Sequence, residues 1–503
     1  MIVSEPRENS ITGGERMGLK FGPILLMPDI ERRHLFTLFF GAFFGIASMA
    51  FVNVIGPLMF RILEIPQEET GGLAGTLTAV QEIVVILVIG TFGALSDKVG
   101  RRLIYSSGFF LLGIGYFLYP LASDSTELII FRVVVALGCA ANTVMLPTVA
   151  NDYVHESTRG KLIATTSILN GLGLVLIIGT FRNMPGFFSD MGYDNVFSGR
   201  YTAWVASVMC LIVASILFTN LKKGAPSQVS KKEPYLATLK VAFESAKNPR
   251  VALAYVAGVV SRGDLSVVST FFSLWLFNEA STQGLSPGAA FKLSTGFYIT
   301  VQAFAIPGAI LINFFIDRVD RVMALAIAMF IAAGGYLYLG YVEDPINAQT
   351  VIGFSIFNTQ ISLTQMHLGA AWLGLGEIFA NISAISLIGS AAPVKGRGAV
   401  IGAGPAGMTA AYISAMRGLG EIFANISAIS LIGSAAPVKG RGAVIGGFSF
   451  FGAIGILLVA LIGGYLFDNV SPTAPFTMVG FANISLFLLA LFLIFFERRK
   501  KHS

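Results

Sequence analysis

The stretch at residues 71–102, GGLAGTLTAVQEIVVILVIGTFGALSDKVGRR, combines a long apolar run with a short charged loop. About 20 consecutive apolar residues are enough for a helix to cross the hydrocarbon core of a bilayer. Such runs recur along the chain, and of its 503 residues 54% are hydrophobic and only 12% are charged. One globular core cannot hide that much apolar surface, so we expect an all-α membrane protein whose solvent is lipid.

The apolar runs predict membrane spans in two series of six. The spans lie near residues 34–60, 71–95, 103–122, 128–147, 162–180, 201–220, 251–277, 293–315, 322–341, 369–391, 443–466 and 475–496. The expected organisation is a leader at 1–33, a six-helix bundle at 34–220, a central linker at 221–250, a second bundle at 251–496 and a tail at 497–503. Helical spacing of apolar residues at 231–249 favours either a short amphipathic surface helix or a solvated linker.

The basic residues predict the orientation of these spans. Most of the 34 Lys and Arg residues lie in alternate loops, in the central linker and in the tail, whereas the intervening loops are mainly acidic. Because basic loops remain on the cytoplasmic side, we expect an inner-membrane protein with both termini in the cytoplasm. The formal net charge of +6 is therefore explained by the membrane and does not indicate nucleic-acid binding.

The charged end of the opening stretch reads Gly93-Ala-Leu-Ser-Asp97-Lys-Val-Gly100-Arg101-Arg102 and joins the second and third predicted spans. Glycines permit a tight turn there, and the acid and arginines can make charge-assisted contacts at helix ends. The spacing closely resembles the signature loop of the major facilitator superfamily. The resemblance implies a loop that latches the two halves of a transporter together in one conformation and releases them in the other. The alternative is an ordinary basic loop on the cytoplasmic side.

A related loop follows the eighth span, at Asn313-Phe-Phe-Ile-Asp317-Arg318-Val-Asp320-Arg321. It keeps the acid and the bases but has lost both glycines, as a diverged second copy in a transporter built from parallel repeats would.

Two more elements of the first half resemble the same family. Arg132 followed by Gly138 is similar to its Arg-x-x-x-x-x-Gly pattern in the fourth span. The inner segment Asp152-Tyr-Val-His-Glu156-Ser-Thr-Arg159-Gly-Lys is similar to its Glu-x-x-Arg-Gly element. The fifth span lacks the Gly-Pro signature of drug/proton antiporters, and the Pro-Glu-Ser motif of sugar porters is missing after the sixth. No subfamily is therefore assigned.

Five ionisable side chains fall within predicted spans, and a charge near the bilayer centre costs roughly 2.5–3.5 kcal/mol on insertion scales. They are Glu82, Arg132, Arg262, Asp264 and Glu377. We expect Asp264 or Glu82 to take up a proton, and Arg132 or Arg262 to hold an anionic part of the substrate or to serve as the counter-charge. Interhelical salt bridges with a purely structural role are the alternative. Positions 262 and 264 do not face each other on a helix, so these two side chains are expected to have different partners.

Residues 374–402 are repeated identically at 418–446. Diverged copies are usual in transporters, so identity points to a recent duplication or an error in the gene or its assembly. Two Lys-Gly-Arg-Gly turns on the cytoplasmic side require an extra crossing between them, which leaves twelve or fourteen spans open. Glu377 and Glu421 are equivalent by sequence.

The segment Gly402-Ala-Gly404-Pro-Ala-Gly407 taken alone resembles a flavin- or NAD-binding fingerprint. Its context contradicts this, because no series of alternating strands and helices surrounds it and glycine is common where membrane helices pack. Cys139 and Cys210 lie inside spans and indicate neither a disulfide framework nor a metal site. We expect no cofactor.

The family resemblance implies two six-helix bundles around a cavity lined by the first, fourth, seventh and tenth spans. Candidate substrate contacts there are Asn53, Asn142 and Trp275, beside Arg132, Arg262 and Asp264. The expected function is a monomeric, proton-coupled secondary transporter that carries a small organic solute across the membrane by alternating between two conformations. An uncoupled facilitator remains open. A membrane receptor, a scaffold or a flavin-binding membrane enzyme is the alternative from another class.

Overall fold

The computed structural model describes residues 19–22, 24–155, 158–224, 243–316, 318–347, 350–356, 359–391 and 441–502. Among these residues, eleven helices are long and apolar enough to cross a membrane. A further helix of 30 residues, α11 (Pro287–Ile316), occupies the place of the eighth predicted span. The prediction of an all-α membrane protein is confirmed.

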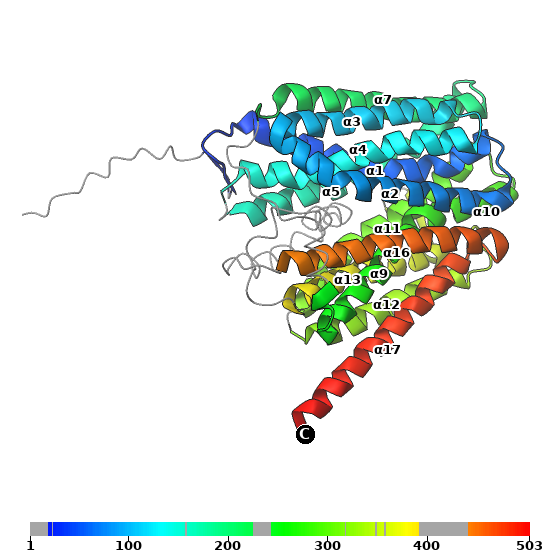
Figure 1. Cartoon of the computed structure of the whole chain (residues 1–503). Helices are drawn as coiled ribbons and strands as arrows, with labels where there is room; N and C mark the ends of the chain where they lie inside the picture. Colours follow the sequence, from blue (N-terminus) through cyan, green and yellow to red (C-terminus); the bar gives the residue numbers. More distant parts are fainter. Residues whose placement is uncertain are drawn as a thin grey trace, which may run out of the picture.

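The first six spans form the N-terminal half of the structure (Figure 1). Their helices are α1 (Arg32–Ile62), α2 (Thr70–Val99), α3 (Arg101–Leu118), α4 (Ser125–Tyr153), α5 (Arg159–Phe181) and α7 (Asn195–Asn220). Within this half α3 packs against α4 and α7, α1 against α5, and α2 against α4. Buried apolar side chains fill the space between these helices.

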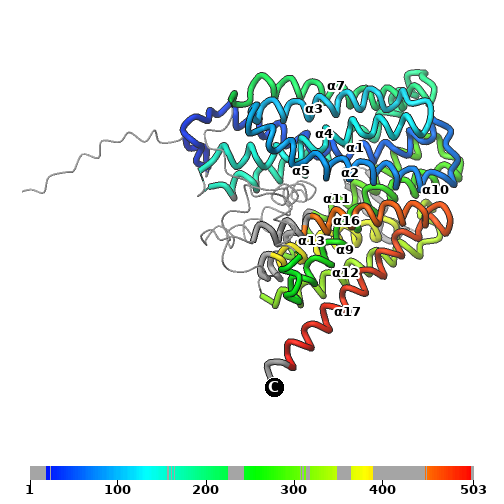
Figure 2. The backbone as a smooth tube through the Cα atoms, viewed as in Figure 1, coloured from blue at the N-terminus to red at the C-terminus, as the bar shows by residue number. Residues whose placement is uncertain are grey.

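The remaining spans form the C-terminal half, which Figure 1 shows beside the first. They are the continuous segment α9 (Pro249–Ser266), η4 (Val267–Phe272) and α10 (Ser273–Thr282), followed by α11, α12 (Arg321–Gly340), α13 (Gln365–Ala391), α16 (Arg441–Asn469) and α17 (Ala474–His502). Here α12 packs against α13 and α17, while α9 packs against α13 and α16. In the view of Figure 2 the C-terminal end of α17 stands apart from the other helices.

The two halves meet most closely where α2 packs against α16. We call the end at which α1 ends and α2 begins the outer end, and the opposite end the inner end. At the outer end a methyl group on Gly75 would lie 2.2 Å from the carbonyl oxygen of Ala460, and one on Gly464 would lie 2.7 Å from that of Gly71. Small residues on both helices therefore let the two backbones touch.

The signature loop is shorter than its motif. Helix α2 continues through Gly93 to Val99, and α3 begins at Arg101, so Gly100 alone makes the turn. Its φ of +99° is a conformation that glycine adopts without strain. Gly93 is buried inside the helix, and the expectation that it forms part of a turn is wrong for this position.

Several elements were not predicted from the sequence. A short helix, α6 (Met184–Asp190), lies in an outer loop, and an antiparallel hairpin of β3 (Thr350–Ile356) and β4 (Thr359–Thr364) precedes α13. A smaller hairpin of β1 (Lys20–Phe21) and β2 (Ile24–Leu25) belongs to the segment expected to be a simple leader. It docks on the inner loop after α4, where His155 N–H donates to the Leu25 carbonyl over 3.0 Å.

The duplicated segment is only partly described. Helix α13 contains Glu377 and ends within the first copy, and α16 begins near the end of the second copy. Residues 392–440, with Glu421 and the glycine-rich segment, lie outside the described residues, as does most of the expected amphipathic helix. The choice between twelve and fourteen spans lies there too.

Candidate functional site

A small cavity lies between the two halves near the outer end. Its volume is about 20 Å³, and its lining residues are Val52, Asn53, Gly56, Pro57, Phe60, Ala74, Leu77, Thr78, Tyr119, Arg132, Thr270 and Leu274. They come from the first, second, fourth and seventh spans and from the turn after α3. A volume of this size holds about one water molecule. The cavity is thus a small chamber with walls from both halves, lined by a mixture of polar and apolar side chains.

Arg132 supplies the only charged side chain in this lining. It is 1% exposed, and its guanidinium donates a hydrogen bond to the Asn53 amide oxygen. Its Nε is buried and has no hydrogen-bond partner among the described residues. A buried cation with an unused donor is suited to an anionic or carbonyl group of a ligand, because such a group forms charge-assisted hydrogen bonds.

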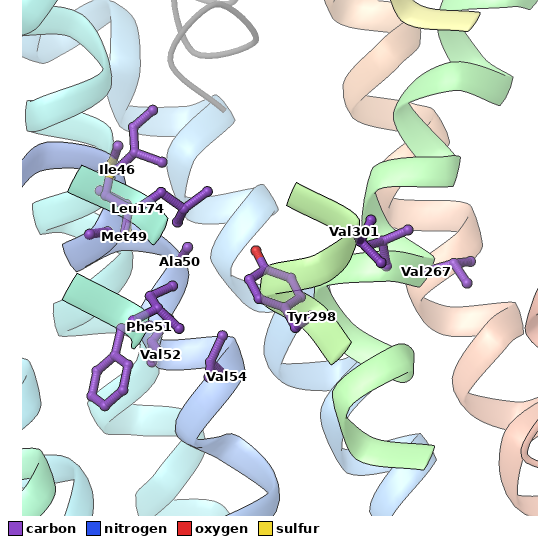
Figure 3. Close-up of a cluster of buried hydrophobic side chains, with 14 of the residues drawn as sticks. Ile46, Met49, Ala50, Phe51, Val52, Val54, Leu174, Val267, Tyr298 and Val301 are labelled. Atoms are coloured by element: carbon purple, nitrogen blue, oxygen red, sulfur yellow. The ribbon is translucent and has the colours of Figure 1, made fainter. Parts of the chain in front are cut away.

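Buried apolar side chains of both halves pack near the boundary between them. Figure 3 shows Ile46, Met49 and Phe51 of α1 with Leu174 of α5 on one side, and Val267 and Val301 on the other. Tyr298 of α11 lies between these two groups and is 1% exposed. These side chains belong to the packed apolar core, and none of those named lines the cavity.

Span seven changes its helical pitch beside the cavity. Residues 267–272 form a π-helical segment, η4, between α9 and α10. Thr270 lies in it, and its hydroxyl is 3.0 Å from the hydroxyl of Thr78 on α2. Single π-helical turns frequently mark functional sites, and this one brings a polar group of the C-terminal half to the N-terminal half.

The other predicted cavity residues lie elsewhere. Asn142 of α4 is 2% exposed and packs inside the N-terminal half, with its amide oxygen against Gly108 of α3. Trp275 of α10 is buried against Phe476 of α17, with ring centroids 5.5 Å apart. Of the three predicted cavity contacts, the structure brings only Asn53 to the cavity.

Glu82 of the N-terminal half interacts electrostatically with Arg262 of the C-terminal half. Glu82 lies half-buried on α2, and the charged group that acts on its carboxylate is Arg262 of α9. The Arg262 side chain is 1% exposed and packs against Gly452 of α16, the helix that also contacts α2. An acid from one half and a base from the other therefore attract each other at membrane depth.

Asp264 lies on a different face of α9 and has different partners. Its carboxylate oxygens are each 3.2 Å from the amide nitrogen of Asn483 on α17, and its backbone carbonyl accepts a 3.0 Å hydrogen bond from the Tyr336 hydroxyl on α12. The charged group that acts on its carboxylate is Glu377 of α13. Asp264 thus belongs to the interior of the C-terminal half rather than to the cavity.

Polar contacts close the outer end between the halves. The Asp468 carboxylate of α16 accepts hydrogen bonds from the backbone N–H groups of Gly71, over 2.7 Å, and Gly72, over 2.5 Å, in the first turn of α2. The Asn278 amide of α10 donates to the Thr70 hydroxyl over 3.0 Å. A carboxylate at a helix N-terminus satisfies free N–H groups and interacts favourably with the helix dipole.

The signature loop and the inner loop motif meet at the inner end. Arg101 forms ion pairs with Asp97 over 2.5 Å and with Asp152 over 2.9 Å. Its guanidinium also donates to the Ser96 hydroxyl. Arg102 lies over the ring of Phe218 on α7, with 4.7 Å from Cζ to the ring centroid. These contacts all lie within the N-terminal half.

The remaining predicted residues are described only in part. Arg159 begins α5 and Arg321 begins α12, while Arg318 is exposed in the turn before α12. Glu156 and Asp317 lie outside the described residues.

Sequence reasoning missed Asp468, Asn483 and Thr270. Asp468 stands at the end of an apolar run, where acids are common in outer loops, and nothing local indicates its partner. Asn483 and Thr270 are neutral, so a search for charges inside spans passes over them. A search for amides and hydroxyls in the middle of apolar runs finds both.

Comparisons with known proteins agree with this architecture. Residues 38–416 match the Major Facilitator Superfamily. The chain is 25% identical over 466 residues to the magnetosome protein MamZ of Paramagnetospirillum magneticum, which covers 89% of this chain, and it spans 61% of the length of MamZ. It is 24% identical to the magnetosome protein MamH of the same organism, over 90% of each chain.

Solved structures show the same fold. The crystal structure of the nucleoside transporter NupG aligns with 92% of this chain and 99% of its own, with a TM-score of 0.61 and 12% identity. The family match covers most of the chain and includes the cavity, the signature loop and the first copy of the duplicated segment. This chain belongs to the Major Facilitator Superfamily.

Proposed function

We propose that the protein is a secondary transporter that carries a small organic solute across the membrane by alternating access, coupled to protons. The observation that carries this proposal is the pair of half-to-half contacts at the outer end, Asp468 to Gly71 and Asn278 to Thr70, above a cavity with walls from both halves. A static scaffold has no use for a chamber whose walls come from two separate halves. Differential binding of solute to two conformations is sufficient for transport, without covalent chemistry.

The solute site we propose is the cavity around Arg132 and Asn53. In the closed state the chamber is too small for a solute and its polar groups face one another. Separation of the halves at either end enlarges it. The buried guanidinium supports a solute with an anionic or strongly polar group, and the apolar lining residues Phe60, Leu77 and Leu274 support an organic body attached to that group.

The coupling step we propose is proton exchange at Glu82. A proton on Glu82 removes its attraction to Arg262, and approach of Arg262 favours loss of that proton. Since the two residues belong to different halves, protonation is linked to how the halves are placed. Asp264, the other candidate acid, has no such partner in the opposite half among the described residues.

Proteoliposomes test this function. Internal pH is followed while organic anions, nucleosides, amino acids, sugars and cationic drugs are added outside one at a time. The proposal predicts solute-dependent proton movement that Glu82→Gln abolishes, whereas Glu343→Gln, at an exposed outer position, leaves it unchanged. Solute equilibration without proton movement would identify an uncoupled facilitator. No movement of any solute would contradict transport for the classes tested.

We further propose that the protein lies in the cell inner membrane with both termini in the cytoplasm, because basic residues concentrate in alternate loops. We also propose that it functions as a monomer, since the two halves of one chain supply all the walls of the cavity. Terminal fusions to a reporter that is active only in the cytoplasm test the orientation. The relatives MamZ and MamH are described as magnetosome proteins, which favours a magnetosome membrane as a second location. Fluorescence microscopy of a tagged chain in a magnetosome-forming cell distinguishes the two.

A further inference from the structure

The C-terminal half contains a buried acidic site that the transport mechanism above does not use. Its centre is the carboxylate of Asp264, which is 0% exposed in the middle of span seven. Helices α9, α12, α13 and α17 enclose it, with Asn483 from α17, Tyr336 from α12 and Glu377 from α13 as neighbours. No lining residue of the cavity around Arg132 belongs to this group.

The charge of Asp264 is not balanced by a base within the described residues. The neighbouring charged group is a second acid, Glu377, which is 7% exposed. Arg262 is close in sequence, but its side chain packs on Gly452 of α16 and acts on Glu82. A carboxylate at this depth without a counter-charge is very unfavourable, so the site requires a proton or a bound cation.

Unused oxygen atoms distinguish these two possibilities. The side-chain oxygens of Asn483, Asn381 and Ser261 are buried and have no hydrogen-bond partner among the described residues. All three residues are at most 1% exposed. A proton on Asp264 would satisfy one oxygen at most, whereas a cation can be bound by several oxygens at once.

Two amides contact α9 within one helical turn of each other. The Asn483 amide nitrogen donates to both carboxylate oxygens of Asp264 at 3.2 Å and to the Val479 carbonyl at 3.0 Å. A cation bound to Asp264 would exchange these bonds for its own contact with the Asn483 oxygen after a half-turn of the amide. Asn381 donates to the backbone carbonyl of Ser261 over 3.4 Å, one helical turn before Asp264. Carboxylate, amide and hydroxyl oxygens without nitrogen or sulfur ligands suit a hard cation.

We propose that Asp264, Asn483, Asn381 and Ser261 form a binding site for an alkali-metal cation, with Na⁺ as the expected ion. One carboxylate with neutral oxygens matches a single positive charge, and the cation would also relieve the repulsion between Asp264 and Glu377. The site ties α9, α13 and α17 together within one half. It therefore stabilises the C-terminal half whether or not a solute is transported.

Thermal unfolding of the purified full chain tests the site without any transport assay. The midpoint is measured as NaCl replaces choline chloride at constant ionic strength, with KCl, LiCl and MgCl₂ as parallel series. We expect a saturable rise with Na⁺ that choline does not produce, because a ligand of the folded state shifts the midpoint by mass action. Asp264→Asn should abolish the rise, and Asp190→Asn, at an exposed outer position, should leave it unchanged.

Two further variants keep the test decisive if Asp264→Asn fails to fold. Ser261→Ala removes one neutral oxygen and should raise the apparent Na⁺ dissociation constant roughly tenfold, as expected for one lost ligand contact. Glu82→Gln should retain the full Na⁺ response, which separates this site from proton coupling. A response to MgCl₂ alone, a midpoint that depends on pH but not on Na⁺, or an unchanged Na⁺ response in Ser261→Ala and Asp264→Asn would each overturn the proposal.

Discussion

The carboxylate of Asp468 on α16 accepts a 2.7 Å hydrogen bond from the backbone N–H of Gly71 on α2, 397 residues away along the chain. The bond joins the two halves at their outer end and uses an N–H group that the helix itself leaves free. It can exist only while the outer end is closed. The strength of this contact should therefore affect which side of the protein is open.

Asp468→Asn should weaken the outer closure. The amide removes the negative charge from the α2 N-terminus, and hydrogen bonds to charged groups contribute about 1.5–3 kcal/mol, which corresponds to at least a tenfold shift toward the outward-open state. The measured quantity is the rate at which a membrane-impermeant maleimide alkylates Thr78→Cys, after Cys139 and Cys210 have been replaced by alanine. This rate should rise in Asp468→Asn, because the outward-open state exposes position 78. Asp190→Asn is the control. Equal alkylation rates in all backgrounds would show that Asp468 does not hold the outer end.

Gly75→Ala should prevent outer closure by steric means. Its new methyl group would lie 2.2 Å from the Ala460 backbone oxygen, a contact that only separation of α2 and α16 can relieve. We expect uptake to fall at least tenfold while the protein remains folded by size-exclusion chromatography. Gly90→Ala on the same helix is the matched control, because a methyl group there meets nothing within 4 Å. Similar uptake by the two variants would contradict the packing argument.

Arg132→Gln should impair solute binding. It removes the buried charge that we assign to the anionic group of the solute, and the loss of one charge-assisted contact raises KM roughly tenfold or more. Arg132→Lys should recover only part of the affinity, because an ammonium lacks the planar donor geometry. Uptake kinetics in proteoliposomes measure both. Lys292→Gln, at an exposed outer site, controls for net charge, and an unchanged KM in Arg132→Gln would remove Arg132 from the solute site.

Asp97→Asn and Asp152→Asn should be non-additive. Both carboxylates contact Arg101, at 2.5 Å and 2.9 Å, so each single substitution perturbs the same guanidinium. A double-mutant cycle on thermal stability should give a coupling of about 0.5 kcal/mol or more. Additive effects would indicate that the two inner motifs act separately.

An element could be predicted when neighbouring residues in the sequence determine it, and could not when distant contacts do. The span at 71–95 could be predicted because a run of apolar residues needs lipid wherever its neighbours lie. The sequence did not show that Gly100 alone makes the following turn while Gly93 stays inside the helix. The hairpin at β3 and β4 lacks a clear local signal, since its alternating pattern is short and lies between two apolar runs. Its formation depends on tertiary contacts that the local pattern does not encode.

The residues of the candidate site also divide into those that the sequence predicts and those whose role depends on tertiary packing. Arg132 and Glu82 stand out because an isolated charge in a span is costly by itself. Asp468 acquires its role from Gly71 and Gly72, whose free N–H groups come near only after the two halves have packed. Asn142 and Trp275 were expected at the cavity because they are polar or aromatic in cavity-lining spans. However, the face that each presents is determined by packing against Gly108 and Phe476.

The most direct test of alternating access is a reversible lock at the outer end. Thr70→Cys and Asn278→Cys introduce thiols at side chains whose polar atoms are 3.0 Å apart, in a background without Cys139 and Cys210. Uptake of a solute identified in the proteoliposome panel is measured after oxidation and again after reduction. We expect oxidation to stop uptake, reduction to restore it, and neither single-cysteine variant to respond. Undiminished uptake by the oxidised, cross-linked protein would contradict alternating access.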